Sequence, residues 1–169
     1  MREYVVTCCS TADMSRTFME TNEVPFAMFH YQLDGKEYAD DLYSSISPEV
    51  FYKMIGDGAQ PVTSQVNAEA YCALFEPVLK SGKDVLHLTL SSGISGSINS
   101  ANVAKTQMEE KYPDRRVMVV DSLAASSGYG MLVEQTLENQ RAGMSLEENA
   151  AWIVAHRHTL HHWFFSTDL

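Results

Sequence analysis

Val85-Leu86-His87-Leu88-Thr89-Leu90 is a short, mostly apolar run that continues directly into Ser91-Ser92-Gly93-Ile94-Ser95-Gly96-Ser97. The first stretch predicts a buried strand, because it is apolar, short and followed by turn residues. The second predicts a strand-to-helix loop, where glycines let the backbone approach a ligand and hydroxyls can donate hydrogen bonds. The helix that follows would point free N–H groups and a partial positive charge at this loop. The loop therefore suits a carboxylate or a phosphate.

The same pattern of strand, polar loop and helix is predicted on both sides of this stretch. Tyr4-Val5-Val6-Thr7-Cys8 predicts a first strand, which ends at the small polar residues Ser10-Thr11-Ala12-Asp13. Helices are expected over residues 68–80, 97–111 and 126–141, and a strand over residues 116–120 ends at Asp121-Ser122. Strands that alternate with helices form parallel sheets with right-handed crossovers. The sequence predicts an α/β fold with a mainly parallel sheet flanked by helices.

A small β-hairpin interrupts this alternation. Residues 26–33 and 36–38 meet across Asp34-Gly35, a dipeptide that satisfies the positive φ angles of a tight turn. The remaining expected elements are a helix that begins at Ser47-Pro48 and ends by Gly56 or Gly58, an extended loop over residues 60–65, a helix capped at Ser145 and a final strand at Trp163-Phe164-Phe165.

Composition narrows the function classes. The 169 residues, 45% hydrophobic and 20% charged, indicate one globular domain over residues 1–169, without repeats or an interdomain linker. A net charge of -10 with only 12 Lys and Arg argues against a nucleic-acid partner. The apolar stretches are too short for membrane insertion. Cys8, Cys9 and Cys72 are odd in number and no secretory segment precedes them, so we expect a cytoplasmic protein.

Several motifs together resemble the DegV family of bacterial fatty-acid-binding proteins. They appear in order along nearly the whole chain: Ser10-Thr11-Ala12-Asp13, Thr63-Ser64-Gln65, the loop at 91–97 followed by Asn99-Ser100-Ala101, and Val120-Asp121-Ser122 followed by Ser127-Gly128-Tyr129-Gly130.

The resemblance implies a lipid carrier rather than an enzyme. Family members bury one long-chain fatty acid, hold its carboxylate with hydroxyl groups and in some bacteria present it to a fatty acid kinase; no cofactor or metal is implied. By motif, Thr63 and Ser95 are the expected head-group donors. Their expected neighbours in the site are Ser64, Ser92, Gly93 and Gly96, and second-line candidates are Ser10, Asp121 and Ser122.

Two departures from the family pattern matter. The family usually has Asp before the Ser-Thr of the first loop, where this chain has Cys9. The family also has a second domain that supplies an Arg and a His to the head group, and this chain stops at Ser166-Thr167-Asp168-Leu169, about where that domain would begin. The resemblance is thus to an isolated amino-terminal domain.

Elementary energetics favours a buried lipid independently of the resemblance. Burial of an alkyl chain contributes roughly 0.8 kcal/mol per methylene, so about 14 methylenes contribute on the order of 11 kcal/mol before ordering costs. A desolvated carboxylate regains only about 1.5 to 3 kcal/mol per good hydrogen bond, so several donors must act together.

The main alternative is a serine hydrolase. Ser95 in strand-turn-helix context, Asp121 and one late histidine follow the chain order of an α/β-hydrolase triad. Against it, position 97 is Ser where the nucleophile elbow has Gly. Strand-to-helix loops also carry Ser and Gly for capping alone. The four late histidines could suggest a metal site, but no acidic residue joins them at ligand spacing: His156, His158, His161 and His162.

Overall fold

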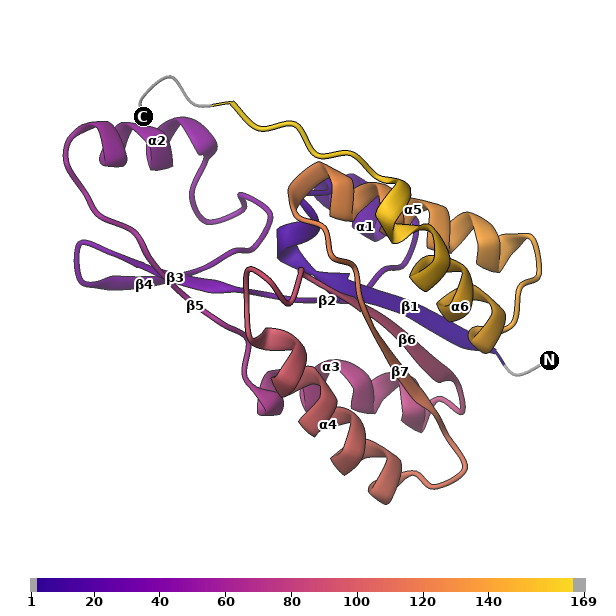
Figure 1. Ribbon diagram of the computed structural model, residues 1–169. Coiled ribbons are helices and arrows are strands. Elements are labelled where there is room, and N and C mark those ends of the chain that lie inside the picture. Colours follow the sequence, from indigo (N-terminus) through magenta and orange to yellow (C-terminus); the bar gives the residue numbers. More distant parts are fainter. Residues whose placement is uncertain (1–2, 166–169) are drawn as a thin grey trace.

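The computed structural model describes residues 3–165, and the chain end at 166–169, where the domain crossing was expected, lies outside them. Its centre is a parallel four-stranded sheet in the order β2-β1-β6-β7, which confirms the predicted α/β class (Figure 1). All six residues of β6 are buried, as the apolar run at 85–90 predicted. The strands are β1 (Tyr4–Cys9), β2 (Phe26–Ala27), β6 (Asp84–Thr89) and β7 (Val117–Asp121).

Helices cover both faces of this sheet (Figure 1). Their starts follow from capping residues: the Asn67 side chain accepts a hydrogen bond from the N–H of Ala70, and Ser145 forms a capping box with Glu148. One face carries α3 (Ala68–Lys80) and α4 (Ser97–Lys111), and the other carries α1 (Arg16–Thr21), α5 (Ser126–Arg141) and α6 (Leu146–His156).

A second, antiparallel sheet in the order β4-β3-β5 extends beyond the carboxyl end of the first sheet (Figure 1). The hairpin turn is where the sequence placed it, with φ of 51° at Asp34 and 74° at Gly35. The strands are β3 (His30–Leu33), β4 (Lys36–Ala39) and β5 (Val62–Ser64), and α2 (Pro48–Gly56) lies beside them. Short 3-10 turns occur at η1 (Ser10–Ala12) and η2 (Arg157–Thr159).

Three local predictions were wrong. The expected loop at 60–65 contains β5, which pairs with β3. Phe26–Ala27 pairs with β1 instead of belonging to the hairpin. Residues 161–165 form no strand, and the side chains of Trp163 and Phe165 are 91% and 95% exposed. Phe26–Ala27 and β5 are strands of these sheets because they pair with segments distant in sequence. Residues 161–165 pair with no strand among the described residues, so their β propensity alone does not make them a strand.

Within residues 3–165, no helix combines the length and the apolar character needed to cross a bilayer.

Candidate functional site

The loops after β6 and β7 are tied together at the carboxyl edge of the parallel sheet. Ser92 donates its backbone N–H to Asp121 Oδ1 at 3.1 Å, and the N–H of Leu123 reaches the same oxygen at 3.0 Å. Ser91 donates its N–H to the carbonyl of Ala124 at 3.0 Å. The two loops therefore meet at one edge of the sheet, and the Asp121 carboxylate joins them.

The segment after β5 reaches the same loop. A Cβ built at Gly96 would lie 2.7 Å from Gln65 Oε1, so the Gln65 side chain rests on the Gly96 backbone. Thr63 and Ser64 lie in β5 immediately before it. The structure thus brings Gln65, the last residue of the Thr63-Ser64-Gln65 motif, against the loop that carries Ser95.

The predicted hydroxyls differ in what they already bind. Ser10 and Ser122 are buried, at 1% and 0% exposure, and accept the N–H of Phe29 and Ala124 at 3.1 Å each. Ser95 Oγ accepts the N–H of Ser97 at 3.2 Å, which leaves its own proton out of that bond. Ser64 donates to the carbonyl of His30 at 3.4 Å.

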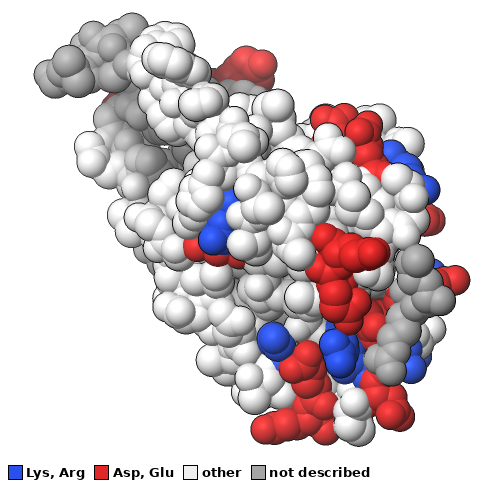
Figure 2. Space-filling model, turned by 45° about the vertical axis from the view of Figure 1, so that its right-hand side comes forward, with Lys and Arg blue, Asp and Glu red and all other residues white. Residues whose placement is uncertain are grey.

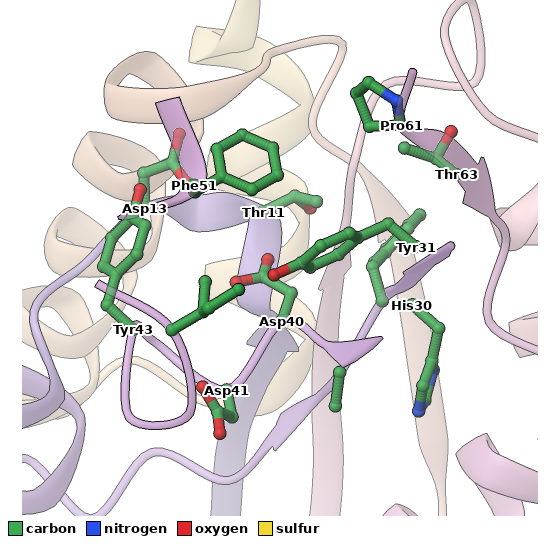
Figure 3. Close-up of a pocket in the computed structure, with 13 residues that line it drawn as sticks. Thr11, Asp13, His30, Tyr31, Asp40, Asp41, Tyr43, Phe51, Pro61 and Thr63 are labelled. Atoms are coloured by element: carbon green, nitrogen blue, oxygen red, sulfur yellow. The ribbon is translucent and has the colours of Figure 1, made fainter. Parts of the chain in front are cut away.

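A pocket of about 280 Å³ lies between η1, the small sheet and α2 (Figure 3). Thr63 lines it, and none of the other predicted site residues is among the described residues that do. Its apolar lining comes from Phe29, Ala39, Ile46, Phe51 and Pro61. Small-molecule pockets are typically about 300–1,000 Å³ and mostly apolar, so this one is slightly smaller than that range.

Tyr31 connects the two sides of the pocket. It stands opposite Thr63 in the β3–β5 register, so their side chains share a face of the small sheet. Its ring stacks on Tyr38 at 5.5 Å and meets Phe51 edge-on at 5.4 Å, which attaches α2 to the sheet. Figure 3 shows Thr63 and Pro61 toward one side of the pocket and the acidic residues toward the other.

That second side is acidic. Asp13, Asp40 and Asp41 line the pocket, and none of the described lining residues is Lys or Arg. Burial raises the pKa of Asp40, a hydrogen bond from Ser10 counteracts this in part, and the charge of Asp13 raises it further. The hydroxyl oxygen of Thr11, also in the lining, is buried without a hydrogen-bond partner.

Sequence reasoning missed most of these lining residues. Tyr31 and Phe51 had a readable signal, since they are large apolar residues on the hairpin and the helix that were predicted correctly. The acidic side had none, because Asp13 and Asp40 are separated in sequence and a turn composition explains each of them equally well.

Cys9 ends β1 inside a buried polar cluster. Its Sγ lies 3.3 Å from the Tyr71 hydroxyl and 3.8 Å from His87 Nε2, and Thr7 Oγ1 lies 2.9 Å from His87 Nδ1. Burial lowers the pKa of His87 to about 3 and raises that of the Cys9 thiol. Both groups are therefore neutral near pH 7.

The geometry gives little support to the alternatives from sequence. The hydrogen bonds found for Ser95 and the Asp121 carboxylate join them to backbone amides and not to a histidine. Within residues 3–165, no group of three or more His, Cys, Asp or Glu side chains is placed to hold a metal ion.

The amino-acid sequence is similar to those of one known protein family. A family described as "Uncharacterised protein, DegV family" matches residues 5–169. A DegV domain-containing protein of Clostridium perfringens is 32% identical over 164 residues, which cover 97% of this chain and 56% of that protein.

Two solved structures have the same fold. A fatty-acid-binding DegV family protein from Thermus thermophilus superposes with a TM-score of 0.81 at 31% identity, covering 94% of this chain and 54% of the other. A stearic-acid-binding protein from Eubacterium ventriosum gives a TM-score of 0.81 at 28% identity, covering 90% and 52%. This chain thus spans about half the length of the relatives it matches. It belongs to the DegV family.

Proposed function

We propose that this chain binds a long-chain fatty acid as a non-catalytic carrier, with the hydrocarbon tail in the pocket between the small sheet and α2. The observation that carries the proposal is Thr63, which lines an apolar pocket; Gln65, two residues later, contacts Gly96 of the loop at 91–97. The fold supports it, because the related proteins from Thermus thermophilus and Eubacterium ventriosum bind fatty acids.

The charges in the pocket orient the ligand. A carboxylate placed among Asp13, Asp40 and Asp41 would be repelled without any lining Lys or Arg to compensate. At the Thr63 side it would instead meet a hydroxyl, and Gln65, two residues later, contacts Gly96 at the N-terminal end of α4, an end that favours anions. The acid therefore binds with its carboxylate at Thr63 and its tail along Phe29, Ile46 and Phe51.

We assign the head group to Thr63 and Ser95, with Ser64, Ser92, Gly93 and Gly96 shaping the surrounding loops. Ser10, Asp121 and Ser122 remain second-line candidates, and their internal hydrogen bonds suit them to holding the loops in place. Each good hydrogen bond to a desolvated carboxylate contributes about 1.5 to 3 kcal/mol, which makes two or more donors necessary.

The test is direct binding of hexadecanoate to the purified 169-residue chain, measured by calorimetry and by native mass spectrometry. We expect one equivalent to bind, and Thr63→Ala or Ser95→Ala to weaken binding by about ten-fold each. Thr106→Ala is the matched control, because Thr106 is exposed on α4 and donates to the carbonyl of Asn102. Failure of the parent chain to bind hexadecanoate would remove the proposal.

A kinase partner and a cytoplasmic location stay predictions. The fold is also shared with a fatty acid kinase B3 protein of Streptococcus pneumoniae loaded with linoleic acid, at a TM-score of 0.76 and 22% identity. We expect a bacterial fatty acid kinase with ATP to convert the carried acid to its acyl phosphate.

A fluorophosphonate probe, which labels active-site serines of hydrolases, should leave Ser95 unlabelled. Stoichiometric labelling of Ser95 would instead support the serine hydrolase alternative.

A further inference from the structure

We propose that the Gln65 side-chain amide is a further head-group ligand, held in place by the close approach that glycine allows at position 96. This inference rests on the proposed function. It adds a residue that recognises the charged end of the ligand, two residues after Thr63 and in contact with Gly96, the neighbour of Ser95.

The first step is the placement of Gln65 along the chain. It follows directly after β5 (Val62–Ser64), two residues beyond Thr63, and it is exposed. Gln65 is not itself among the described residues that line the pocket, as Thr63 is. It then reaches the loop that carries Ser95, as its contact with Gly96 shows.

The second step concerns why position 96 is glycine. Gly96 has φ of -75° and ψ of 3°, a conformation open to any L residue, so backbone freedom is not the reason. The reason is space, since a Cβ would lie 2.7 Å from Gln65 Oε1 and 3.7 Å from Gln65 Cδ. A side chain at 96 would push the Gln65 amide away from its resting position.

The third step is chemical. The Gln65 amide carries an NH₂ group, which offers two donors. A carboxylate beside Thr63 and Ser95 needs donors beyond two hydroxyls to replace its lost water. An amide satisfies that need without adding charge to a protein whose net charge is already -10.

The experiment compares two ligands of equal length, hexadecanoate and 1-hexadecanol. We expect Gln65→Glu to weaken hexadecanoate binding by about ten-fold or more, since a carboxylate replaces a donor, and to change hexadecanol binding by less than about two-fold. Gln32→Glu is the matched control: it adds the same charge to the same sheet, next to Tyr31 and therefore on the opposite face.

A double-mutant cycle tests the role of Gly96. Gly96→Ala should weaken hexadecanoate binding by about five-fold in the parent chain and by much less in a Gln65→Ala background, where there is no amide to displace. Circular dichroism melting curves establish that each variant folds.

The outcomes separate the inference from the function on which it rests. Unchanged hexadecanoate affinity in Gln65→Glu, or an equal loss for both ligands, overturns the role of Gln65 while the parent chain still binds the acid. Additive effects of Gly96→Ala and Gln65→Ala overturn the positioning by Gly96. Failure of the parent chain to bind either ligand overturns the proposed function itself.

Discussion

His87 is a histidine whose surroundings keep it uncharged. Its ring is fully buried on β6, with Thr7 Oγ1 at one nitrogen, Cys9 Sγ near the other and the rings of Tyr71 and Phe75 at its edges. No carboxylate is among these contacts, so nothing offsets the cost of placing a cation there. Burial accordingly lowers its pKa to about 3.

We predict that this histidine makes the protein acid-sensitive. The unfolded chain takes up a proton near pH 6.5 that the folded chain refuses until about pH 3, so stability falls as the pH drops between these values. For this group the loss of unfolding free energy between about pH 7 and pH 5 is about 2 kcal/mol. Urea unfolding at both pH values measures it.

His87→Gln supplies the control, because it keeps polar atoms near Thr7 and Cys9 but cannot titrate. The variant should lose less stability than the parent over the same pH interval, even if it is less stable at neutral pH. Equal pH dependence in the two proteins would contradict the prediction. Proton NMR of the His87 ring should likewise find it neutral at about pH 5.

At the scale of elements, α5 approaches η1 closely at Gly130. A Cβ at this position would lie 2.6 Å from the backbone carbonyl of Ala12 and 2.5 Å from Met14 Sδ. The Met14 side chain can move, but the backbone oxygen of Ala12 can move only with the turn that holds Ser10 and Thr11. The glycine therefore sets the distance between α5 and the first loop of the site.

Gly130→Ala should lower the free energy of unfolding by about 1–3 kcal/mol, the usual cost of overpacking. Gly56→Ala is the matched helical control, since nothing lies within 4 Å of its Cβ position and its φ is not positive. That change should leave stability unaltered or raise it slightly. Chemical denaturation of the two variants and the parent decides; equal stability of both variants would refute the contact.

The helix α2, which lines the pocket through Phe51, buries little of its surface. No residue of Pro48–Gly56 is buried, and its ring contact with the small sheet is that of Phe51 on Tyr31. Segments with little buried surface open at low free-energy cost. We expect the amides of α2 to exchange with deuterium faster than those of α3, which buries Tyr71, Phe75, Val78 and Leu79.

Ligand binding should reverse this difference in part. An acyl chain against Phe51 and Ile46 would add apolar contacts to α2, so hexadecanoate should slow the exchange of its amides about ten-fold. Exchange in α3 should change little, because that helix does not line the pocket. Unaltered exchange in α2 with bound ligand would place the tail elsewhere.

Elements with local signals were predictable from the sequence, and those that depend on distant partners were not. The helices begin where Ser47, Asn67 and Ser145 cap them, because each cap hydrogen bond is made within a few residues. The strand β5 was missed because its exposed residues show no alternation and it exists only through pairing with β3. The aromatic run at 163–165 has the composition of a strand, but among the described residues no other strand pairs with it.

The candidate site also has a part that the sequence could indicate and a part that it could not. The loop at 91–97 was recognisable as a strand-to-helix loop at the carboxyl edge of a parallel sheet, whereas Thr63 was named only through the family resemblance. The acidic side of the pocket and the contact of Gln65 with Gly96 arise from packing between segments far apart in sequence. No local pattern encodes such contacts.

At the scale of the whole molecule, the net charge of -10 opposes the approach of an anionic ligand. Acidic side chains are more prominent than basic ones on the face that Figure 2 shows, and Asp13, Asp40 and Asp41 line the pocket. Salt screens such repulsion, since the Debye length falls from about 30 Å at 0.01 M to about 8 Å at 0.15 M ionic strength. The charge distribution should therefore be visible in the kinetics of binding.

We predict that dodecanoate associates faster as salt is added, by about two-fold or more between 0.01 M and 0.15 M ionic strength. Dodecanol, which is neutral and equally long, should show almost no dependence on salt, and it controls for effects of salt on the apolar tail. Stopped-flow fluorescence below the micellar concentration measures both rates. A dodecanoate rate that falls with salt would mean that local cationic groups attract the acid, which contradicts a head-group site built from hydroxyl and amide donors alone.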